Sequence, residues 1–553
     1  MKINYYIIAL VVFGNCFTSY AGLSDIKKQQ MLNSQKSEKT DQVDLNLKLS
    51  NTFGSEKFDE QELTKRIITK EILSGHNYVS ELTKEDQWKA IEALSKMANE
   101  GNAAAQYTLG DIYSIGSVTP KNIGKAIKWY SQAAGKGYEN AMFLLGYMYF
   151  NGEGVTQDKA KAFEWLSKAA EQGQSSAQLV LGKMYDDGEG VTEDKSKALK
   201  WYSKAAEQEN ASAQYFLGRM YHDGDGVKED KSKALEWFSK AAEQGDADAQ
   251  ARLGIIYLWA DGVKEDKSKA FEYLSKAAEQ GDAPAQYLLG RMYSSGQGVK
   301  NDKSKALKWY SKAAEQGVAE AQLFLGMMYF EGDGVKEDKS KALKWFLMAA
   351  EQGNADAINY LGYMYKNGDG VPQDKKTAFE WYSKAAEQGD ARAQFFLGTM
   401  YHFGEVVTKD IKKALKWYVK AAELGDARAQ ALLGLMYFQG KEVAKDKTKA
   451  LEYLLKAAEQ GEEKAQSLLG VMYMSGDGVP QNEKTGFEWY SKAAEQGDAL
   501  AQLSVGLSYM EGEGVSKNKI KAYEWLLKSA GQGNENAQNV LDSLCRESPW
   551  ACK

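Results

Sequence analysis

Apolar and polar residues recur along this chain with a period of 36 residues. An alanine occupies every thirty-sixth position from Ala105 to Ala537 without insertion or deletion, which defines twelve units over residues 105–536 and then a half-unit. Counted from that alanine as offset 0, apolar residues recur at offsets 4, 7 and 8, as Leu289, Met292 and Tyr293 do. These offsets lie on one face of a helix. The pattern therefore predicts a helix, here called helix A, at the start of every unit.

A second helix, helix B, is predicted in the other half of each unit. Helix A is expected to end at a Gly-x-Gly-Val turn, because glycine adopts the left-handed conformations that terminate helices. An acidic or asparagine residue follows, such as Asp302, whose side-chain oxygen suits an N-cap. The position taken by Trp309 is tryptophan in ten of the twelve units. In this unit the predicted buried stripe of helix B is Ala306, Trp309, Ala313 and Ala314.

Offset 5 is glycine in all twelve units, from Gly110 to Gly506. A glycine in the middle of a helix costs up to about 1 kcal/mol relative to alanine. We therefore expect it to permit a close crossing of two helices at which a β-carbon would clash. Two helices for every 36 residues, each burying its apolar face on its neighbours, predict an all-α fold, an α-solenoid of stacked helix pairs.

The segments before and after the repeats are predicted to differ from them. Residues 1–21 have the composition of a secretory signal, with an apolar run too short to span a bilayer and small residues at the cleavage site, although an uncleaved anchor stays open as an alternative. Residues 22–57 are polar and are expected to form a mobile leader. Apolar spacing predicts capping helices over residues 58–104, and residues 537–553 are expected to cap the other end.

The repeated pattern AQYxLGxMYxxGxGVxxDxxKAxxWYxKAAEQG closely resembles the Sel1-like repeat, a relative of the tetratricopeptide repeat. The resemblance covers residues 105–536. It implies a right-handed superhelix and a family of scaffold and adaptor proteins, many of them exported by bacteria. Such proteins bind other proteins, in some pathogens host proteins such as an immunoglobulin or a receptor.

The composition argues against nucleic-acid binding and against a zinc site. The net charge is −6 at pH 7, with basic and acidic residues evenly mixed, whereas nucleic-acid binding requires a concentrated basic surface. The chain has three cysteines and three histidines, too few to build a multi-ligand zinc site. In an oxidising compartment Cys545 and Cys552 are candidates for a disulfide, and two free thiols are the alternative. We expect no cofactor and no nucleic acid partner.

Catalysis finds little support among the residues. His222 and His402 occupy the same offset five units apart and are interpreted as exposed helix positions, and His76 has no nearby partner in sequence. The resemblance includes secreted members for which β-lactam hydrolysis or binding is suggested, but the matching motifs at Ser24–Lys27, Ser516–Lys519 and Lys484–Gly486 fall in the leader or in ordinary repeat positions. The sequence therefore predicts a protein that is not an enzyme. A β-lactam-interacting cell-wall hydrolase is kept as an alternative.

Acidic turns suggest a third kind of chemistry. Asp223 and Asp225, with the equivalent Asp333 in another unit, resemble the oxygen-rich spacing of a calcium loop. The glycine comes too early for the complete motif, and no bidentate glutamate closes it. These residues are weak candidates for divalent-ion binding, and a cation-binding structural repeat protein is a further alternative.

Protein binding is the function that the sequence favours. Offsets 6, 9 and 10 of helix A change in residue type from unit to unit, so they are interpreted as free of packing constraints. In the tetratricopeptide family, which this chain resembles, the corresponding helix lines the concave face. Aromatic and arginine side chains there are typical of binding hot spots. The candidates are Tyr147, Phe150, Arg219, His222, Trp259, Arg291, Phe330, Tyr363, His402, Phe403 and Phe438.

Trp259 and Phe403 depart most clearly from their neighbours, because each replaces a polar residue of the turn. Local packing against an adjoining turn is the alternative interpretation for both. The sequence therefore predicts an exported, non-enzymatic scaffold that binds a protein partner on its concave surface, in the periplasm, at the cell surface or after secretion.

Overall fold

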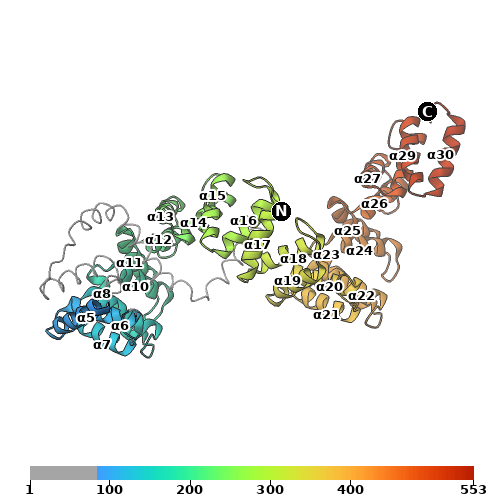
Figure 1. Ribbon diagram of the computed structural model, residues 1–553. Coiled ribbons are helices and arrows are strands. Elements are labelled where there is room, and N and C mark those ends of the chain that lie inside the picture. Colours follow the sequence, from blue (N-terminus) through green and yellow to red (C-terminus); the bar gives the residue numbers. More distant parts are fainter. Residues whose placement is uncertain (1–83, 117, 553) are drawn as a thin grey trace. The chain divides into compact units, whose positions relative to one another are not determined.

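The computed structural model describes residues 84–116 and 118–552. All regular secondary structure in those residues is helical, as the repeat pattern predicts. The chain divides into two compact units, Met1–Asn301 and Asp302–Lys553. Within each unit, successive helices pack side by side in chain order (Figure 1). The predicted signal, the predicted leader and the first part of the predicted capping helices lie outside the described residues.

Helices A and B alternate along both units. Helix A is α6 (Ala103–Ile115), α8 (Glu139–Asn151), α10 (Ser175–Asp187), α12 (Ala211–Asp223), α14 (Ala247–Trp259) and α16 (Ala283–Ser295) in the first unit, and α18 (Ala319–Glu331), α20 (Ala355–Asn367), α22 (Ala391–Phe403), α24 (Ala427–Gln439), α26 (Glu463–Ser475), α28 (Ala499–Glu511) and α30 (Glu535–Glu547) in the second. Helix B is α5 (Lys84–Asn99), α7 (Ile123–Gly135), α9 (Lys159–Glu171), α11 (Lys195–Glu207), α13 (Lys231–Glu243) and α15 (Lys267–Glu279) in the first unit, and α17 (Lys303–Glu315), α19 (Lys339–Glu351), α21 (Lys375–Glu387), α23 (Ile411–Glu423), α25 (Lys447–Glu459), α27 (Glu483–Gln496) and α29 (Lys519–Gly531) in the second.

Helix boundaries follow from local hydrogen bonds. At the end of α18, Gly332 has a φ of 73°, and its N–H donates to the carbonyl of Met328, which closes the helix. At the start of α19, Asp338 accepts a hydrogen bond of 3.0 Å from the backbone N–H of Lys341. The N-cap predicted at Asp302 is confirmed in the same way, by a bond of 3.0 Å from the N–H of Lys305.

The predicted buried stripe of helix B requires a correction at its aromatic position. Ala306, Ala313 and Ala314 are buried as expected, but Trp309 is only half-buried, and the residue after it, Tyr310, is 1% exposed. Tyr310 lies one helical turn from each of the flanking alanines, so its side chain completes the same face. The indole of Trp309 instead lies beneath the ammonium group of Lys312, 4.6 Å from the ring centroid.

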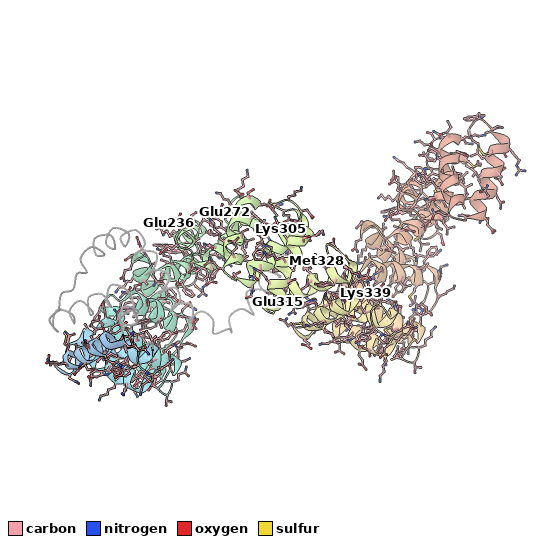
Figure 2. The ribbon with its side chains drawn as sticks, viewed as in Figure 1. Glu236, Glu272, Lys305, Glu315, Met328 and Lys339 are labelled. Atoms are coloured by element: carbon pink, nitrogen blue, oxygen red, sulfur yellow. A yellow bond between two sulfur atoms is a disulfide. The ribbon has the colours of Figure 1, made fainter. Side chains whose placement is uncertain are left out.

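The outer surface of helix B carries paired charges. Glu236 accepts from the ammonium group of Lys240 at 2.7 Å, and Glu272 accepts from Lys276 at 2.6 Å, four residues along the helix in each case. Figure 2 labels both glutamates among the side chains that project from the first unit. Such exposed pairs each add only about 0.3–0.5 kcal/mol.

The helix A glycine sits at the crossing with helix B of its own repeat. A β-carbon at Gly218 would lie 2.7 Å from a ring carbon of Phe238, and one at Gly362 would lie 2.6 Å from a ring carbon of Tyr382. Real β-carbons essentially never approach another atom so closely. The prediction of a crossing that excludes a side chain is therefore confirmed.

A row of buried glutamines links neighbouring helices. The glutamine at offset 1 of helix A donates its amide N–H to an alanine carbonyl of the preceding helix B, as Gln430 does to Ala422 at 2.9 Å. Its own side-chain oxygen accepts from the glutamine that follows helix B of the same repeat, as Gln430 does from Gln460 at 2.8 Å. Each such pair satisfies buried polar groups that otherwise cost about 1–3 kcal/mol. The other pairs are 178–208, 214–244, 250–280, 322–352, 466–496 and 502–532.

The carboxyl end of the chain is closed by a disulfide. Cys545 in α30 is bonded to Cys552, seven residues later. Of the two alternatives that the sequence left open, a disulfide and two free thiols, the disulfide is therefore observed. Both cysteines pack beside the core formed by α29 and α30. Among residues 84–116 and 118–552, no helix has both the length and the apolar character required to cross a membrane.

The crossing glycine gives a first prediction. Replacing Gly218 with alanine forces a β-carbon into the ring of Phe238, and overpacking of this kind costs about 1–3 kcal/mol. Gly135 is the matched control, because it is also helical but has no heavy atom within 4 Å of a β-carbon, so Gly135→Ala is expected to stabilise by about 0.5–1 kcal/mol. Urea unfolding, with hydrogen exchange read in α12 and α13, measures both. Equal stability of the two variants contradicts the crossing constraint.

A buried helix cap gives a second prediction. Burial, reinforced by the nearby Asp248, raises the pKa of Asp246 to about 7. Between the unfolded pKa of about 3.9 and pH 7 the folded state binds the extra proton, so stability falls as pH rises through that range. Asp246→Asn keeps an N-cap oxygen, as Asn210 and Asn354 do in their repeats, without the charge. It is expected to raise the free energy of unfolding at pH 8 by on the order of 2 kcal/mol, with little change at pH 4.

The control for this prediction is Asp426→Asn. Asp426 is also an N-cap, with a side chain that is 5% exposed, but its carboxylate accepts from the guanidinium of Arg428 at 2.7 Å, so removing its charge is expected to lower stability. Urea melts at both pH values measure the two variants. A gain at pH 8 in Asp426→Asn, or none in Asp246→Asn, contradicts the argument.

Candidate interaction surface on helix A

Side chains at offsets 6 and 9 line one face of the successive A helices. In the first unit, Arg219 at offset 6 of α12 donates to Asp186 at offset 9 of α10, at 2.6 Å. In the second unit, the ring of Phe330 at offset 9 of α18 lies 6.1 Å from that of Tyr363 at offset 6 of α20. These positions recur on every A helix of each unit, and at the two pairs just described they join one A helix to the next. We call this face the helix A wall.

Offset 9 is not free of packing, contrary to the sequence interpretation. Its side chain lies over the buried residue of helix B in the same repeat. In some repeats that residue is a tyrosine beside a polar side chain: Tyr202 lies 3.4 Å from Asp186, and the hydroxyl of Tyr418 lies 3.4 Å from His402. In another repeat it is Phe346, and offset 9 is Phe330, with ring centroids 6.1 Å apart. In these repeats the side chain at offset 9 contacts the interior.

Between α10 and α12 of the first unit the wall is charged, and the charges neutralise one another. The side chain of Asp186 is 2% exposed and accepts from both Lys195, at 2.8 Å, and Arg219, at 2.6 Å. The guanidinium of Arg219 also lies 5.1 Å from the ring centroid of Phe216. A carboxylate this deeply buried needs both partners, because an unpaired charge there costs several kcal/mol. Arg219 is therefore engaged within the repeats.

His222 belongs to a second charged cluster in that unit. Its two ring nitrogens lie 2.6 Å from Asp223 and 2.7 Å from Asp261, and the side chain is only 13% exposed. The hydrogen bond to Asp223 raises the pKa of His222, and burial opposes that rise. Asp261 also pairs with Lys231 at 2.6 Å. The interpretation of His222 as an ordinary exposed position is therefore wrong, since it ties α12 to the turn after α14.

In the second unit the wall exposes apolar side chains. At offset 6 of four A helices, between 37% and 45% of each apolar side chain is exposed. These four residues, here called the apolar stripe, are Tyr363, Leu435, Val471 and Leu507. Helices α24, α26 and α28, which carry the last three, pack in succession. Exposed apolar residues in register on adjacent elements are typical of a protein-binding surface.

Sequence reasoning identified Tyr363 but missed the other three residues of the stripe. It selected aromatic and arginine side chains as anchors and passed over aliphatic ones. The signal was present, because offset 6 changes from the charged Lys183 and Arg219 of the first unit to Leu435, Val471 and Leu507 in the second.

Two of the predicted binding residues are buried. Tyr147 is 8% and Phe150 is 7% exposed, and both belong to the core that α8 shares with its neighbours. Phe143 packs on Tyr147 with ring centroids 6.1 Å apart, and Lys159 lies over the ring of Phe150. The expectation that these two rings are exposed is therefore wrong, because Phe143 packs on the first and Lys159 lies over the second. Arg291, Phe330 and Phe438 are half-buried.

Phe403 is the most exposed of the predicted residues, at 67%. Its ring stacks on that of His402, with centroids 4.8 Å apart, and His402 is held by Glu442 at 3.1 Å. His402, at 14% exposure, is thus a structural residue, contrary to the sequence interpretation. Phe403 projects beyond it and is available for contact.

Trp259 is half-buried and ends α14. The residue after it, Ala260, has a φ of 59°, at a position where the other A helices in residues 103–547 that end before a turn of this type have glycine. A left-handed residue with a β-carbon costs about 1–2 kcal/mol. The polar, glycine-capped turn is thus replaced here by Trp259 and a strained alanine, which marks this turn as different from the others.

The acidic turns do not converge on an ion site. In residues 84–116 and 118–552 no group of three His, Cys, Asp or Glu side chains is placed to hold a metal ion. Asp223 lies against His222, and Asp333 accepts from Lys303 at 2.7 Å. Asp225 lies in the same turn as Asp223. In the serine motif at Ser516–Lys519, the ammonium group of Lys519 donates to Ser548 at 2.7 Å. The motif at Ser24–Lys27 and the residue His76 lie outside the described residues.

Comparison with known proteins accounts for the repeat. The family model of the Sel1 repeat matches twelve consecutive segments, from residues 103–138 to residues 499–534. No curated protein matches the chain.

Two solved structures are similar over large parts of the chain. One is c5321, a protective antigen of uropathogenic Escherichia coli strains that displays an SLR fold: it is 37% identical, the match covers 81% of this chain and 97% of c5321, and the TM-score is 0.70. The other is a Sel1 repeat protein from Oxalobacter formigenes, 37% identical over 56% of this chain and 90% of that protein, with a TM-score of 0.43.

Proposed function

Since the chain belongs to the Sel1 repeat family, we propose that it is an exported, non-enzymatic scaffold that binds a protein partner through the helix A wall. The observation that carries the proposal is the apolar stripe of the second unit. Four apolar side chains repeat at the same offset and remain partly exposed. Their burial against a partner supplies favourable free energy, at about 25 cal/mol for each Å² removed from water.

The charged wall of the first unit has a different role in this proposal. Its acids and bases neutralise one another within the repeats, so it holds the A helices together rather than anchoring a partner. Partner contact therefore centres on the stripe and on Phe403, with the surrounding charges contributing to orientation and rate of association.

Export is supported by two observations. Residues 1–21 have the composition of a secretory signal. The similar protein c5321 is a protective antigen of uropathogenic strains. A host protein such as an immunoglobulin or a receptor is accordingly the partner class that we propose first, on the concave face that the A helices line in related repeats.

The third prediction tests the stripe. The variant combines Leu435→Glu with Val471→Glu, so two charges replace apolar contacts. The affinity for the partner is expected to fall by a factor of ten or more, which is about 1.4 kcal/mol or more of binding free energy. Glutamate is a good helix former, so the A helices are expected to persist. The measurement is quantitative affinity capture from envelope extract and host secretions with the wild type and the variant, followed by mass spectrometry.

Leu527→Glu is the matched control. Leu527 is 48% exposed, but it lies on α29, a B helix, away from the wall. Melting curves and circular dichroism establish that both variants remain folded. If the stripe variant captures the same proteins as the wild type and the control, the partner does not bind this stripe.

A further inference from the structure

The glutamine row is interrupted at one repeat. The position that follows helix B is Gln460 in the repeat of Gln430, but it is Leu424 in the repeat of Gln394. Gln394 still donates its amide N–H to the carbonyl of Ala386, at 3.1 Å. Its side-chain oxygen Oε1 is buried and has no hydrogen-bond partner, although the residue is only 4% exposed. The acceptor of Gln394 therefore lacks the donor that its counterparts in seven other repeats have.

A pocket occupies the place of the missing glutamine. It has a volume of about 440 Å³, lies between α21 and α23, and is lined by Gln394 together with Trp417 and Leu424. Leu424 is 58% exposed, so the side chain that replaces the glutamine projects toward solvent instead of filling the space. Glu387, Lys420 and Glu423 also line the pocket, and the ammonium group of Lys420 lies 4.4 Å from the ring centroid of Trp417.

The row has a second irregularity, at Gln106. Lys136 stands where that repeat would have its glutamine, and the ammonium group of Lys136 donates to the carbonyl of Gly101. The amide of Gln106 lies 3.4 Å from Gln132, while its Oε1 is buried without a hydrogen-bond partner. The repeat of Gln394 differs in that its unsatisfied oxygen belongs to a residue that lines a pocket.

We propose that the pocket beside Leu424 binds a primary carboxamide, the side chain of a glutamine or asparagine presented by a partner polypeptide. The carboxamide donates its N–H to Oε1 of Gln394 and replaces the absent member of the row. Its apolar stem packs against Trp417 and Leu424. The source of the carboxamide, a partner polypeptide, rests on the proposed scaffold function. The pocket and its preference for a carboxamide do not rest on that function.

The chain itself supplies the reason for choosing this group. In seven other repeats a carboxamide N–H meets the equivalent oxygen at 2.7–2.9 Å, so the site has the geometry for a neutral, planar donor on a short flexible stem. A buried acceptor without a donor favours any ligand that satisfies it over an apolar ligand of the same shape. The lining also carries Lys420, Glu387 and Glu423, so the lysine probe tests whether charge rather than the free oxygen decides binding.

Two substitutions change the pocket in opposite ways. Leu424→Gln restores the row from within the chain, occupies the pocket and is expected to raise the urea midpoint of unfolding. Gln460→Leu removes the donor of Gln430 and opens an equivalent pocket one repeat further along. The two variants exchange the same two residue types in opposite directions, so the number of pockets of this kind goes from one to none in the first and to two in the second.

The fourth prediction uses small probes on the full chain, so it needs no protein partner. The probes are the N-acetyl N-methylamides of glutamine, methionine and lysine, followed by saturation-transfer difference NMR at up to about 10 mM, since a single small contact binds weakly. We expect the glutamine probe to bind the wild type about fivefold or more better than either of the others. Its signal is expected to disappear in Leu424→Gln and to increase in Gln460→Leu.

Several results overturn the assignment. If the glutamine probe binds the wild type and Leu424→Gln equally well, its binding site lies elsewhere on the chain. Equal or stronger binding of the methionine or lysine probe shows an apolar or anionic pocket with no preference for a carboxamide. The absence of any signal at 10 mM rejects the site. Because these outcomes do not depend on partner capture, they test the pocket independently of the proposed scaffold function.

Discussion

The distance between the two helices of each repeat is set by the contact between a helix A glycine and a large buried side chain of helix B. At Gly218 and at Gly362 a single added carbon would lie within 2.7 Å of an aromatic ring. The close crossing lets Phe238 and Tyr382 fill the interior of their repeats completely, with no exposed surface. The cost of a mid-helix glycine is offset by this packing, since a buried aromatic side chain contributes about 1.5–3 kcal/mol.

This crossing also determines what the other positions of helix A can do. Offset 9 contacts the buried side chain of helix B, with a polar atom near a tyrosine hydroxyl at Asp186 and with an apolar ring at Phe330. Offset 6 meets offset 9 of the preceding A helix, as Arg219 and Tyr363 do. In the second unit it carries the apolar stripe.

The periodic part of the fold was predictable because each rule acts within about 36 residues. Helix positions, the cap at Asp302 and the crossing glycines follow from spacing and from the conformations that each residue type favours. The aromatic of helix B was misplaced by one residue, because Trp309 and Tyr310 both lie near the alanine stripe and the pattern alone does not reveal which ring points inward. The larger ring remains at the surface under Lys312.

The candidate surface was less predictable, because exposure depends on neighbours from other repeats. Tyr147 and Phe150 resemble Tyr363 and Phe403 in sequence, yet Phe143 and the surrounding core of α8 cover the first pair and leave the second exposed. Likewise the charged residues Arg219 and His222 gain partners 33 and 39 residues away in sequence, at Asp186 and Asp261. Residue type at a variable position is therefore insufficient without the contacts between repeats.

A repeat array tolerates local irregularities because each repeat contacts mainly its neighbours. The loss of one glutamine at Leu424 leaves the adjoining pairs at Gln430 and Gln466 intact, so the fold continues while one buried oxygen stays unsatisfied. Such a group costs about 1–3 kcal/mol, and a ligand that supplies the missing hydrogen bond recovers part of that free energy on binding. In a structure built from twelve similar repeats, a position that breaks the pattern and leaves a pocket is therefore a physically reasoned place to look for recognition.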